Sequence, residues 1–419
     1  MKVWIFQTGE PLHTDEGNPR SMRAMNLADA LVAAGHSVTI WSSAFYHQET
    51  RHRASEYQCI NISSSLEVRL IPSPGYVRNI GLGRLFDHLL LAWNLKQILK
   101  NDGGIPDVAF IGFPPIEFAY SAVRYLNGKG IPYMLDAKDM WPDYFVEKIP
   151  SQLRFMGRVI FYPWFLLTEY SFKHAAAFST ISNGYLSWMY RVSRRDSNPL
   201  DIVAPTSTTY KNEAFADNAD IITTWAKNGV LIGQHKIFYY AGTINKTLDF
   251  DSLVYTAKKL ADIECQFRLV ICGDGPEKEN LQQQFNGLNN VVFTGWVNKD
   301  MLYVLAKNAL ASLIPYRNSE TFAMGIPNKL SDALSIGVPV ISCLGGEVNR
   351  LINDNEIGFC YDHDKSEQLL ARCLNYLNNP KLFLNYSKKA KQIYKTRFDF
   401  EVIYGALVKN MNELGKMQK

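Results

Sequence analysis

The sequence has little of what marks a secreted or a nucleic-acid-binding protein. Only 6 cysteines occur in 419 residues, and none form a Cys-x-x-Cys pair, so the disulfide framework of a small secreted domain is not indicated. The 44 Lys and Arg residues nearly balance the 40 Asp and Glu residues, for a net charge of +4. Because this excess is small for the length, we expect no nucleic-acid partner. Because no disulfide framework is indicated, we expect the cysteines to be reduced.

Long hydrophobic runs are also missing. No stretch approaches the roughly 20 apolar residues that a transmembrane helix needs. The first nine residues, Met1–Gly9, carry too short an apolar run for a signal peptide and are typical of a β-strand. The sequence therefore predicts a cytoplasmic protein without a membrane span.

Several catalytic signatures are absent as well. The chain has no Gly-x-x-x-x-Gly-Lys-Ser/Thr loop, no His-Glu-x-x-His and no Gly-x-Ser-x-Gly. Its eight histidines show no metal-ligand spacing. These absences disfavour a phosphate-binding GTPase, a zinc hydrolase and an esterase, and we predict no metal site.

What the sequence does contain is two series of short apolar runs that alternate with helical patterns. At 419 residues the chain exceeds the size at which one core usually keeps growing. The alternation is typical of parallel sheets with crossover helices. The first series is Val3–Phe6, Ser37–Trp41, Val108–Ile111, Tyr133–Asp136 and Phe178–Ile181, and the second is Ile237–Ala241, Phe267–Cys272, Val291–Phe293, Ala311–Ile314 and Val338–Ser342.

We therefore predict an α/β fold with two Rossmann-like domains. The polar segment 196–234 has no long apolar period, so the domain linker is expected within it. The predicted boundaries are 1–205 for the first domain and 206–397 for the second. A helical pattern at 398–419 is expected to cross back onto the first domain.

The segment from Met324 to Cys343 is the strongest candidate for a nucleotide site. It contains Gly325, Ile326, Pro327, Asn328, Lys329 and Asp332 before an apolar strand. Pro327 and Gly337 bracket a short helix, whose free N–H groups and positive dipole end suit a diphosphate. Lys329 adds a cation, and Asp332 can accept hydrogen bonds from ribose hydroxyls. The segment is equally compatible with an ordinary helix capped by Pro and Gly.

Two further glycine-containing loops follow strands of the second series. Gly242, Thr243 and Lys246 could present backbone N–H groups and a cation to phosphate. The sequence Gly273-Asp274-Gly275 has the composition of a plain tight turn, but beside Gly242 it could form a wall for a base.

Two loops of the first series could bind an acceptor or a sugar. Gly17 and Asn18 precede Arg20, which could pair with a phosphate or an acidic acceptor; the alternative is a solvated turn with a helix N-cap at Asn18. In the loop 137–143, Asp139 could hold sugar hydroxyls and Trp141 could stack on a sugar ring. Alternatively, Asp139 caps the next turn and Trp141 belongs to the core.

The order of these motifs resembles that of the family 4 glycosyltransferases across nearly the whole chain. The resemblance is closest to a bacterial branch that often serves surface-polysaccharide assembly. The matching motifs are Gly-His-Ser-Val-Thr-Ile at 35–40, Asp-Met-Trp-Pro at 139–142, Ala-Gly at 241–242, Cys-Gly-Asp-Gly-Pro at 272–276, Asn-Val-Val-Phe-Thr-Gly at 290–295 and Asp-Ala-Leu-Ser-Ile-Gly-Val-Pro-Val at 332–340.

The resemblance implies a GT-B fold, in which two Rossmann-like domains with parallel sheets face each other. It also implies sugar transfer with retention of anomeric configuration, an acceptor site mainly in the first domain, and a nucleoside-diphosphate sugar as donor. No cofactor or metal ion is implied. By the family's motifs, Asp332 binds ribose, residues 325–329 face the diphosphate and donor sugar, and Lys246 matches a cationic diphosphate contact.

The chain departs from the family pattern at three positions. Met324 stands where a glutamate is common, Thr243 stands where an arginine is usual, and Asp139 occupies the region of a first-domain histidine. The donor sugar therefore cannot be carried over. We predict catalytic roles for Asp139, Lys246 and Lys329, and acceptor contacts for Gly17, Asn18, Arg20 and Trp141.

The predicted function is transfer of a sugar to a glycan or lipid-linked acceptor in bacterial surface-polysaccharide assembly. Two alternatives remain open: a sugar-nucleotide 2-epimerase on the same architecture, and a non-catalytic sugar-nucleotide-binding subunit, which Met324 makes conceivable. Segments 76–100 and 153–173 mix basic, aromatic and leucine residues, as helices on an anionic membrane surface do. Ordinary core helices show the same pattern. A position at the inner face of the cytoplasmic membrane is one expectation.

Overall fold

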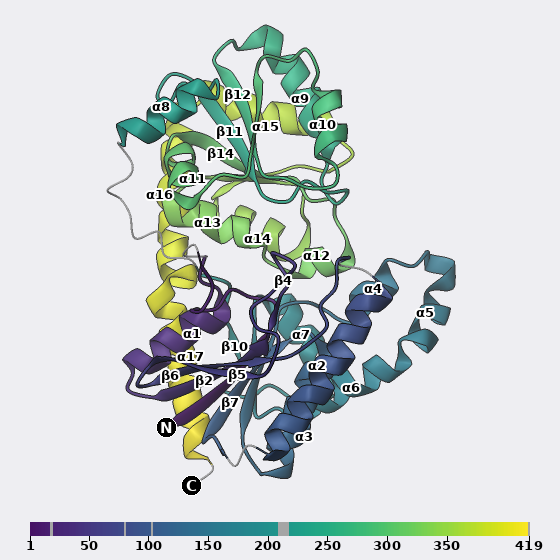
Figure 1. The fold of residues 1–419 in the computed structure, drawn as a ribbon. Helices are drawn as coiled ribbons and strands as arrows, with labels where there is room; N and C mark the ends of the chain where they lie inside the picture. Colours follow the sequence, from purple (N-terminus) through teal and green to yellow (C-terminus); the bar gives the residue numbers. More distant parts are fainter. Residues whose placement is uncertain (17–19, 79–80, 102–103, 208–217, 418–419) are drawn as a thin grey trace. The chain divides into compact units, whose positions relative to one another are not determined.

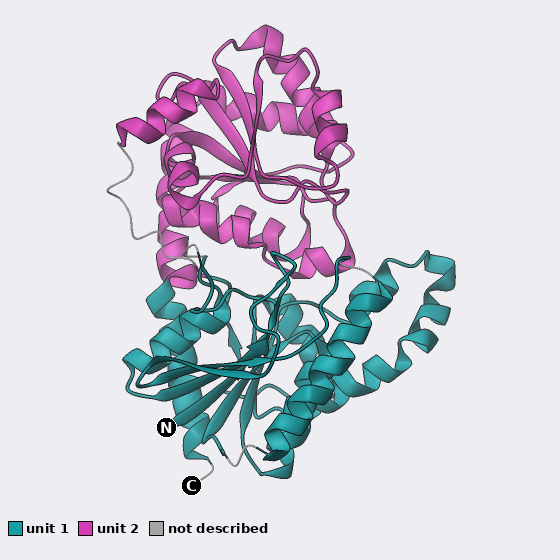
Figure 2. Cartoon of the chain, viewed as in Figure 1, with its two compact units in different colours: residues 1–206, 400–419 teal, residues 207–399 magenta. Residues whose placement is uncertain are grey.

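The computed structural model describes residues 1–16, 20–78, 81–101, 104–207 and 218–417. They form two compact units, which Figure 2 shows in teal and magenta. Unit 1 comprises Met1–Thr206 and Phe400–Lys419, and unit 2 comprises Ser207–Asp399. These boundaries differ from the predicted ones by one or two residues, and the C-terminal segment belongs to unit 1.

Unit 1 is built on an eight-stranded sheet in the order β10-β9-β8-β7-β1-β2-β6-β5. The neighbouring strands are parallel except β5 and β6. The bounds are β1 Lys2–Phe6, β2 Ser37–Ser43, β5 Gln58–Ser63, β6 Leu66–Ile71, β7 Val108–Phe113, β8 Tyr133–Ala137, β9 Ala177–Thr180 and β10 Ile202–Val203, with a separate ribbon of β3 Phe45–Tyr46 and β4 Arg51–His52.

Helices cover both faces of this sheet (Figure 1). On one face, α1 (Arg23–Ala33) and the C-terminal α17 (Phe400–Lys416) share one apolar core, which includes Leu27, Leu31, Leu407 and Met411. The other helices are α2 Leu82–Asn101, α3 Ile116–Gly128, α4 Asp143–Glu147, α5 Arg154–Ile160, α6 Tyr162–Lys173 and α7 Asn183–Ser193, with a 3-10 turn at Ser151–Leu153.

Unit 2 has a six-stranded, fully parallel sheet in the order β13-β12-β11-β14-β15-β16. The strands are β11 Lys236–Ala241, β12 Phe267–Cys272, β13 Val291–Gly295, β14 Ala309–Ile314, β15 Val340–Ser342 and β16 Gly358–Cys360. The helices are α8 Ala219–Lys227, α9 Phe250–Ile263, α10 Lys278–Gln284, α11 Lys299–Lys307, α12 Glu320–Met324, α13 Asn328–Ile336, α14 Gly346–Asn355, α15 Ser366–Asn378 and α16 Pro380–Ile393, with a π-helical turn at Tyr394–Phe398. Separate apolar cores lie on the two faces of the sheet.

Three segments refine these expectations. The segment 153–173 forms two helices, α5 and α6. The unit boundary lies within the polar segment 196–234, as predicted, but this segment also contains α8, whose Trp225 is fully buried in the core of unit 2. The first helix begins at Arg23 with Met22 as its N-cap residue, so the alternative of a helix N-cap at Asn18 is wrong.

Candidate functional site

The strand order of unit 2 predicts a binding site at the carboxyl ends of two of its strands, β11 and β14. From β11 the chain runs outward through β12 and β13, then returns to the other side of β11 as β14. The loops after β11 and β14 therefore diverge at the switch point, and ligands of open parallel sheets bind beyond the carboxyl ends of strands at such a point. Gly242 follows β11 and Tyr316 follows β14.

Backbone hydrogen bonds lock the loops after β11, β12 and β13 together. The Gly242 N–H donates to the Cys272 carbonyl at 2.8 Å, and the Ile244 N–H donates to the Asp274 carbonyl at 2.9 Å. The Gly273 N–H donates to the Gly295 carbonyl at 2.7 Å. The structure thus brings the predicted residues Gly242, Gly273 and Gly275 into one wall.

Glycine is required at Gly242 and Gly273 by conformation and by space. Both have positive φ angles, +147° and +142°, that other residues rarely adopt. A Cβ atom on Gly242 would overlap the end of the Lys329 side chain, and one on Gly273 would overlap the Gly242 carbonyl. The loop after β11 and the start of α13 are therefore in direct contact.

Lys329 is held against this wall by two tyrosines. Its ammonium donates a hydrogen bond of 2.7 Å to the Tyr316 hydroxyl. It also lies 5.2 Å from the Tyr316 ring centroid and 5.5 Å from that of Tyr240, within the range of cation–π attraction. The Tyr240 hydroxyl donates to the Thr243 carbonyl at 2.7 Å. Burial, with Tyr316 beside it, raises the pKa of Tyr240, so Tyr240 stays a neutral donor.

The helix α13 presents its N-terminus beside Lys329. Pro327 is the N-cap residue, just before the helix, and its side chain does not cap the N-terminal N–H groups of α13. Gly325 ends α12, and Met324 is the last residue of that helix. Asp332 lies one turn beyond Lys329, and this spacing places the two side chains on one face of α13.

Two predicted residues lie at the exposed rim of this site. The Lys246 side chain is 88% exposed and its ammonium is 3.8 Å from the Glu277 carboxylate. Asp274 forms a 2.8 Å ion pair with Lys278, and hydrogen bonds from Lys278 and the Gly275 N–H lower the pKa of Asp274. Lys246 is therefore far more exposed than Lys329, which is partly buried between its neighbours.

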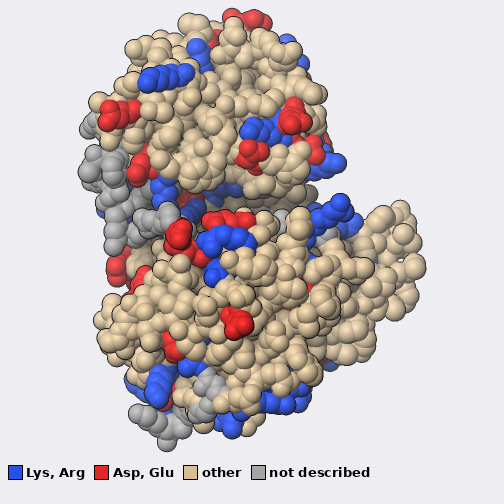
Figure 3. Space-filling model, viewed as in Figure 1, with Lys and Arg blue, Asp and Glu red and all other residues tan. Residues whose placement is uncertain are grey.

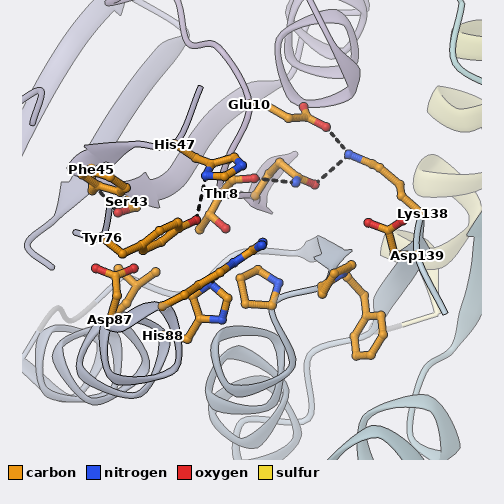
Figure 4. A pocket seen from close by; sticks show the side chains of 17 residues that line it. Thr8, Glu10, Ser43, Phe45, His47, Tyr76, Asp87, His88, Lys138 and Asp139 are labelled. Atoms are coloured by element: carbon orange, nitrogen blue, oxygen red, sulfur yellow. Dashed lines mark hydrogen bonds and ion pairs between the residues drawn. The ribbon is translucent and has the colours of Figure 1, made fainter. Parts of the chain in front are cut away.

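Unit 1 has a switch point of the same kind, between β1 and β7. A pocket of about 230 Å³ opens there, and Figure 4 shows its side chains. Its wall combines the loops after β1, β2, β7 and β8 with one face of α2. The lining residues are Gln7, Thr8, Gly9, Glu10, Ser43, Phe45, His47, Tyr76, Arg84, Asp87, His88, Leu91, Phe113, Pro114, Pro115, Lys138 and Asp139.

The cationic side chains of this pocket contact a carboxylate, an amide and aromatic rings. The Lys138 ammonium contacts the Glu10 carboxylate and donates to the Gln7 side-chain oxygen at 3.1 Å (Figure 4). The Arg84 guanidinium lies 5.4 Å from the Tyr76 ring centroid and 4.9 Å from that of Trp141. The pocket can therefore offer both a cation and carboxylates to a polar ligand, beside aromatic faces.

Two histidines of the pocket are held neutral. Burial, with the positive charge of Arg84 nearby, lowers the pKa of His88 to about 3. Burial and Arg84 also lower the pKa of His47, whose Nδ1 lies 2.8 Å from the Tyr76 hydroxyl. Neutral imidazoles can accept as well as donate hydrogen bonds, as binding of sugar hydroxyls requires.

Asp139 lies at the mouth of the pocket. The surrounding protein raises its pKa to about 6 by desolvation, against the opposing charges of Lys138 and Arg84. The residue keeps substantial contact with solvent, which moderates this rise. Trp141 packs instead in an aromatic cluster, 4.6 Å from Phe145 and 6.0 Å from His88 between ring centroids. The N-cap of the next helix is Pro142, so Asp139 does not cap it.

Of the predicted acceptor contacts at the start of the chain, only Arg20 is among the described residues. Gly17 and Asn18 lie outside the described residues. Arg20 is partly buried ahead of α1 and does not line the pocket.

Sequence reasoning missed Tyr316 and most of the unit 1 pocket. Tyr316 had a signal, because it follows a predicted strand at its carboxyl end. Tyr76, Arg84, Asp87 and His88 had none, because only the packing of α2 against the sheet brings them beside the loops after β1 and β7.

Residues 235–379 match the family model described as Glycosyl transferases group 1. A 144-residue segment is 28% identical to O-antigen chain mannosyltransferase C of Escherichia coli and covers 33% of this chain and 38% of that protein. The chain spans between a third and about half of the length of the curated relatives that it matches.

Two solved structures resemble the chain over 99% of its length. A sucrose-phosphate synthase from Thermosynechococcus elongatus has a TM-score of 0.74 at 16% identity, over 99% of its own chain. Anabaena HepE in complex with UDP-glucose has a TM-score of 0.64 at 14% identity, over 100% of its own chain. These likenesses confirm the GT-B fold, and the family match confirms the resemblance to glycosyltransferases.

Proposed function

From a GT-B fold that carries a glycosyltransferase group 1 domain, we propose that this chain transfers a sugar from a nucleoside-diphosphate sugar to a glycan or lipid-linked acceptor. We propose further that transfer retains the anomeric configuration, needs no metal ion, and serves bacterial surface-polysaccharide assembly at the inner face of the cytoplasmic membrane. Unit 2 binds the donor, and the pocket of unit 1 binds the acceptor.

The arrangement around Lys329 carries this proposal. It lies at the switch point of unit 2, inside the segment that matches the family model. Lys329, the N-terminus of α13 and the loop at Gly242 converge there. Fixed positive charge and N–H donors at one place suit a diphosphate, and they stabilise the negative charge that it gains on leaving.

The proposed reaction breaks the bond between the anomeric carbon and a diphosphate oxygen, and the acceptor hydroxyl oxygen forms the new bond to that carbon. The leaving diphosphate keeps the electron pair of the broken bond, and Lys329 supplies the positive charge that a metal ion supplies elsewhere. The acceptor hydroxyl gives up its proton, and Asp139 is our candidate to receive it, because a pKa of about 6 leaves it ionised at neutral pH. Asp332 holds the donor's ribose.

A thermal-shift screen of UDP-, GDP- and ADP-sugars tests the donor half of the proposal. A ligand at 100 times its dissociation constant adds about 2.7 kcal/mol of stability, so one donor class should raise the melting temperature of unit 2 clearly. Incubation of that donor with and without a sugar acceptor, followed by product analysis, then separates the possible activities. A new glycosidic product supports sugar transfer. An epimerised donor would show that the protein is a sugar-nucleotide 2-epimerase, and an unchanged donor would show that it only binds the sugar nucleotide.

A further inference from the structure

Short helix α5 and the start of α6 expose apolar side chains to an unusual degree. Among residues Arg154–Ile160, all of which the structure describes, only Gly157 is buried. We call the exposed apolar set the α5 patch, and its most exposed member is Phe155, at 76%. It consists of Phe155, Met156, Val159, Ile160, Tyr162 and Leu166.

Such a patch is not explained by packing within unit 1. Monomeric proteins rarely leave large contiguous apolar surfaces uncovered unless the surface binds something. In Figure 1, α5 lies at the outer edge of unit 1, and Figure 3 shows the surface over α5 and α6 almost without charged side chains. The core-helix explanation of segment 153–173 therefore fails for α5.

All charged residues between Glu147 and Glu169 are basic. From Lys148 to Thr168 the chain has no Asp or Glu, and its charged residues are Lys148, Arg154 and Arg158. Arg154 also donates to the Ile149 and Glu147 carbonyls, which fixes the turn before α5. Exposed aromatic and aliphatic side chains bordered by basic residues match the interface of an anionic bilayer.

The helix α2 carries a second exposed apolar stripe. Leu82, Phe86, Leu89 and Trp93 recur at spacings of four, three and four residues, so they share one helix face. The Lys96 ammonium lies 5.9 Å from the Trp93 ring centroid. The opposite face of the same helix contributes Arg84, Asp87 and His88 to the unit 1 pocket.

A continuous row of contacts joins this pocket to the α5 patch. Arg84 lies over Trp141, the Trp141 ring is 4.6 Å from that of Phe145, and Phe145 stacks on Phe161 with centroids 5.6 Å apart. Phe161 is the residue between α5 and α6. The pocket and the α5 patch are therefore fixed with respect to each other within one unit.

A second copy of the chain fits the α5 patch poorly. A two-fold interface would bring the patch against itself and place Lys148, Arg154 and Arg158 near their own copies. Like charges at an interface are unfavourable. A lipid surface with anionic head groups meets the same residues with opposite charge.

We propose that the α5 patch, assisted by the α2 stripe, docks unit 1 on an anionic lipid bilayer. The apolar side chains enter the region between head groups and acyl chains, while Lys148 and Arg158 stay at the head groups. One consequence rests on the proposed function: the acceptor is lipid-linked, and its polar head reaches the pocket from the bilayer beside it.

Flotation with vesicles of phosphatidylcholine, alone or mixed with phosphatidylglycerol, tests the docking. The full chain should float with the mixed vesicles at low salt, and far less with phosphatidylcholine alone or at high salt. The double variant Phe155→Ser/Ile160→Ser should bind the mixed vesicles at least about tenfold more weakly, because two large apolar side chains no longer enter the bilayer. Arg158→Glu should weaken binding to the mixed vesicles selectively.

Matched controls are Ile263→Ser and Leu384→Ser, which remove exposed apolar side chains from unit 2 and should float as the unsubstituted chain does. Equal flotation of the α5 variants and the controls would overturn the proposal, as would no flotation of the unsubstituted chain. A dimer in solution that Phe155→Ser/Ile160→Ser abolishes would assign the α5 patch to a second copy instead. The melting temperature of the same variants with and without donor is measured as well. A normal rise with donor alongside weak flotation would show that docking has failed while donor binding is intact.

Discussion

Two tyrosines, Tyr316 and Tyr240, hold the Lys329 side chain in position. The Tyr316 hydroxyl and the faces of Tyr316 and Tyr240 hold the ammonium beside Gly242. Fixing the cation before the donor arrives lowers the reorganisation needed as charge develops on the leaving group. Lys246, by contrast, is an exposed cation at the rim.

Replacing Lys329 with Ala should therefore slow transfer strongly while leaving the fold intact. Loss of one fixed charge-stabilising group typically costs about 100- to 1000-fold in turnover. The measurement is the initial rate of nucleoside-diphosphate release at saturating donor and acceptor. Lys259→Ala, an exposed lysine of α9, is the control and should keep its full rate. Normal turnover of the Lys329 variant would refute the assigned role.

His88 predicts a pH dependence of stability in unit 1. Its pKa of about 3 in the folded protein lies below the value of 6.5 for an unperturbed histidine. Unfolded chains therefore bind more protons between these values, and stability falls as the pH drops below about 6.5.

His88→Gln should lose less stability than the unsubstituted chain when the pH falls from 7 to 5, with a difference of up to about 2 kcal/mol. Denaturant titrations of unit 1 at the two pH values measure this slope, whatever the variant's stability at pH 7. His174→Gln, at an exposed histidine, should keep the slope of the unsubstituted chain. An unchanged slope for the His88 variant would show that His88 is charged in the folded protein.

At the scale of elements, α8 shows how a polar sequence can still supply a core. Its buried side chain is that of Trp225, whose indole N–H donates to the Met301 carbonyl at 3.1 Å. Ile221 and Ile222 of the same helix are partly buried against that core. A polar composition therefore does not show that a segment is a linker.

Trp225→Ala should destabilise unit 2 by about 3–5 kcal/mol, because it removes a fully buried aromatic side chain. Trp296→Ala removes the same side chain where it is 80% exposed, and should change stability by less than about 0.5 kcal/mol. Thermal and denaturant unfolding of both variants provides the comparison. Similar small effects would mean that α8 is a linker after all.

At the scale of the whole molecule, the last helix of the chain completes the first unit. Leu407, Met411 and Leu414 of α17 are buried with Leu27 and Leu31 of α1 in one core. The Asn26 amide also donates to the Tyr404 hydroxyl at 3.1 Å. Unit 1 therefore combines segments from both ends of the chain.

Leu407→Ala should lower the stability of unit 1 by about 2–5 kcal/mol through the cavity that it leaves, although the residue lies near the C-terminus. Limited proteolysis should then cleave segments of 1–206 sooner, with cleavage within 207–399 unchanged. Val402→Ala, at a more exposed position of α17, serves as the control. Faster cleavage confined to 207–399 would place α17 with unit 2.

Much of this architecture follows from local patterns. Alternation of apolar runs with helical segments predicts both parallel sheets, and the bracketed segment 327–337 predicts α13. Helix starts were less predictable. The side chain of the N-cap residue Met22 does not cap α1. The Ala24 N–H donates instead to the Glu10 carboxylate at 2.9 Å, and a partner so far away in the chain gives no local signal of the helix start.

The sequence by itself determined that both sheets are largely parallel, where glycine must stand and that Lys329 lies in the first turn of a short helix, because these depend on patterns of residues near one another in the chain. Only the tertiary structure decided that Tyr316 and Tyr240 hold Lys329, that α2 lines the unit 1 pocket, and that the α5 patch is exposed. The physical reason is that side-chain contacts and burial between distant segments arise only when each sheet brings its strand ends and helices together.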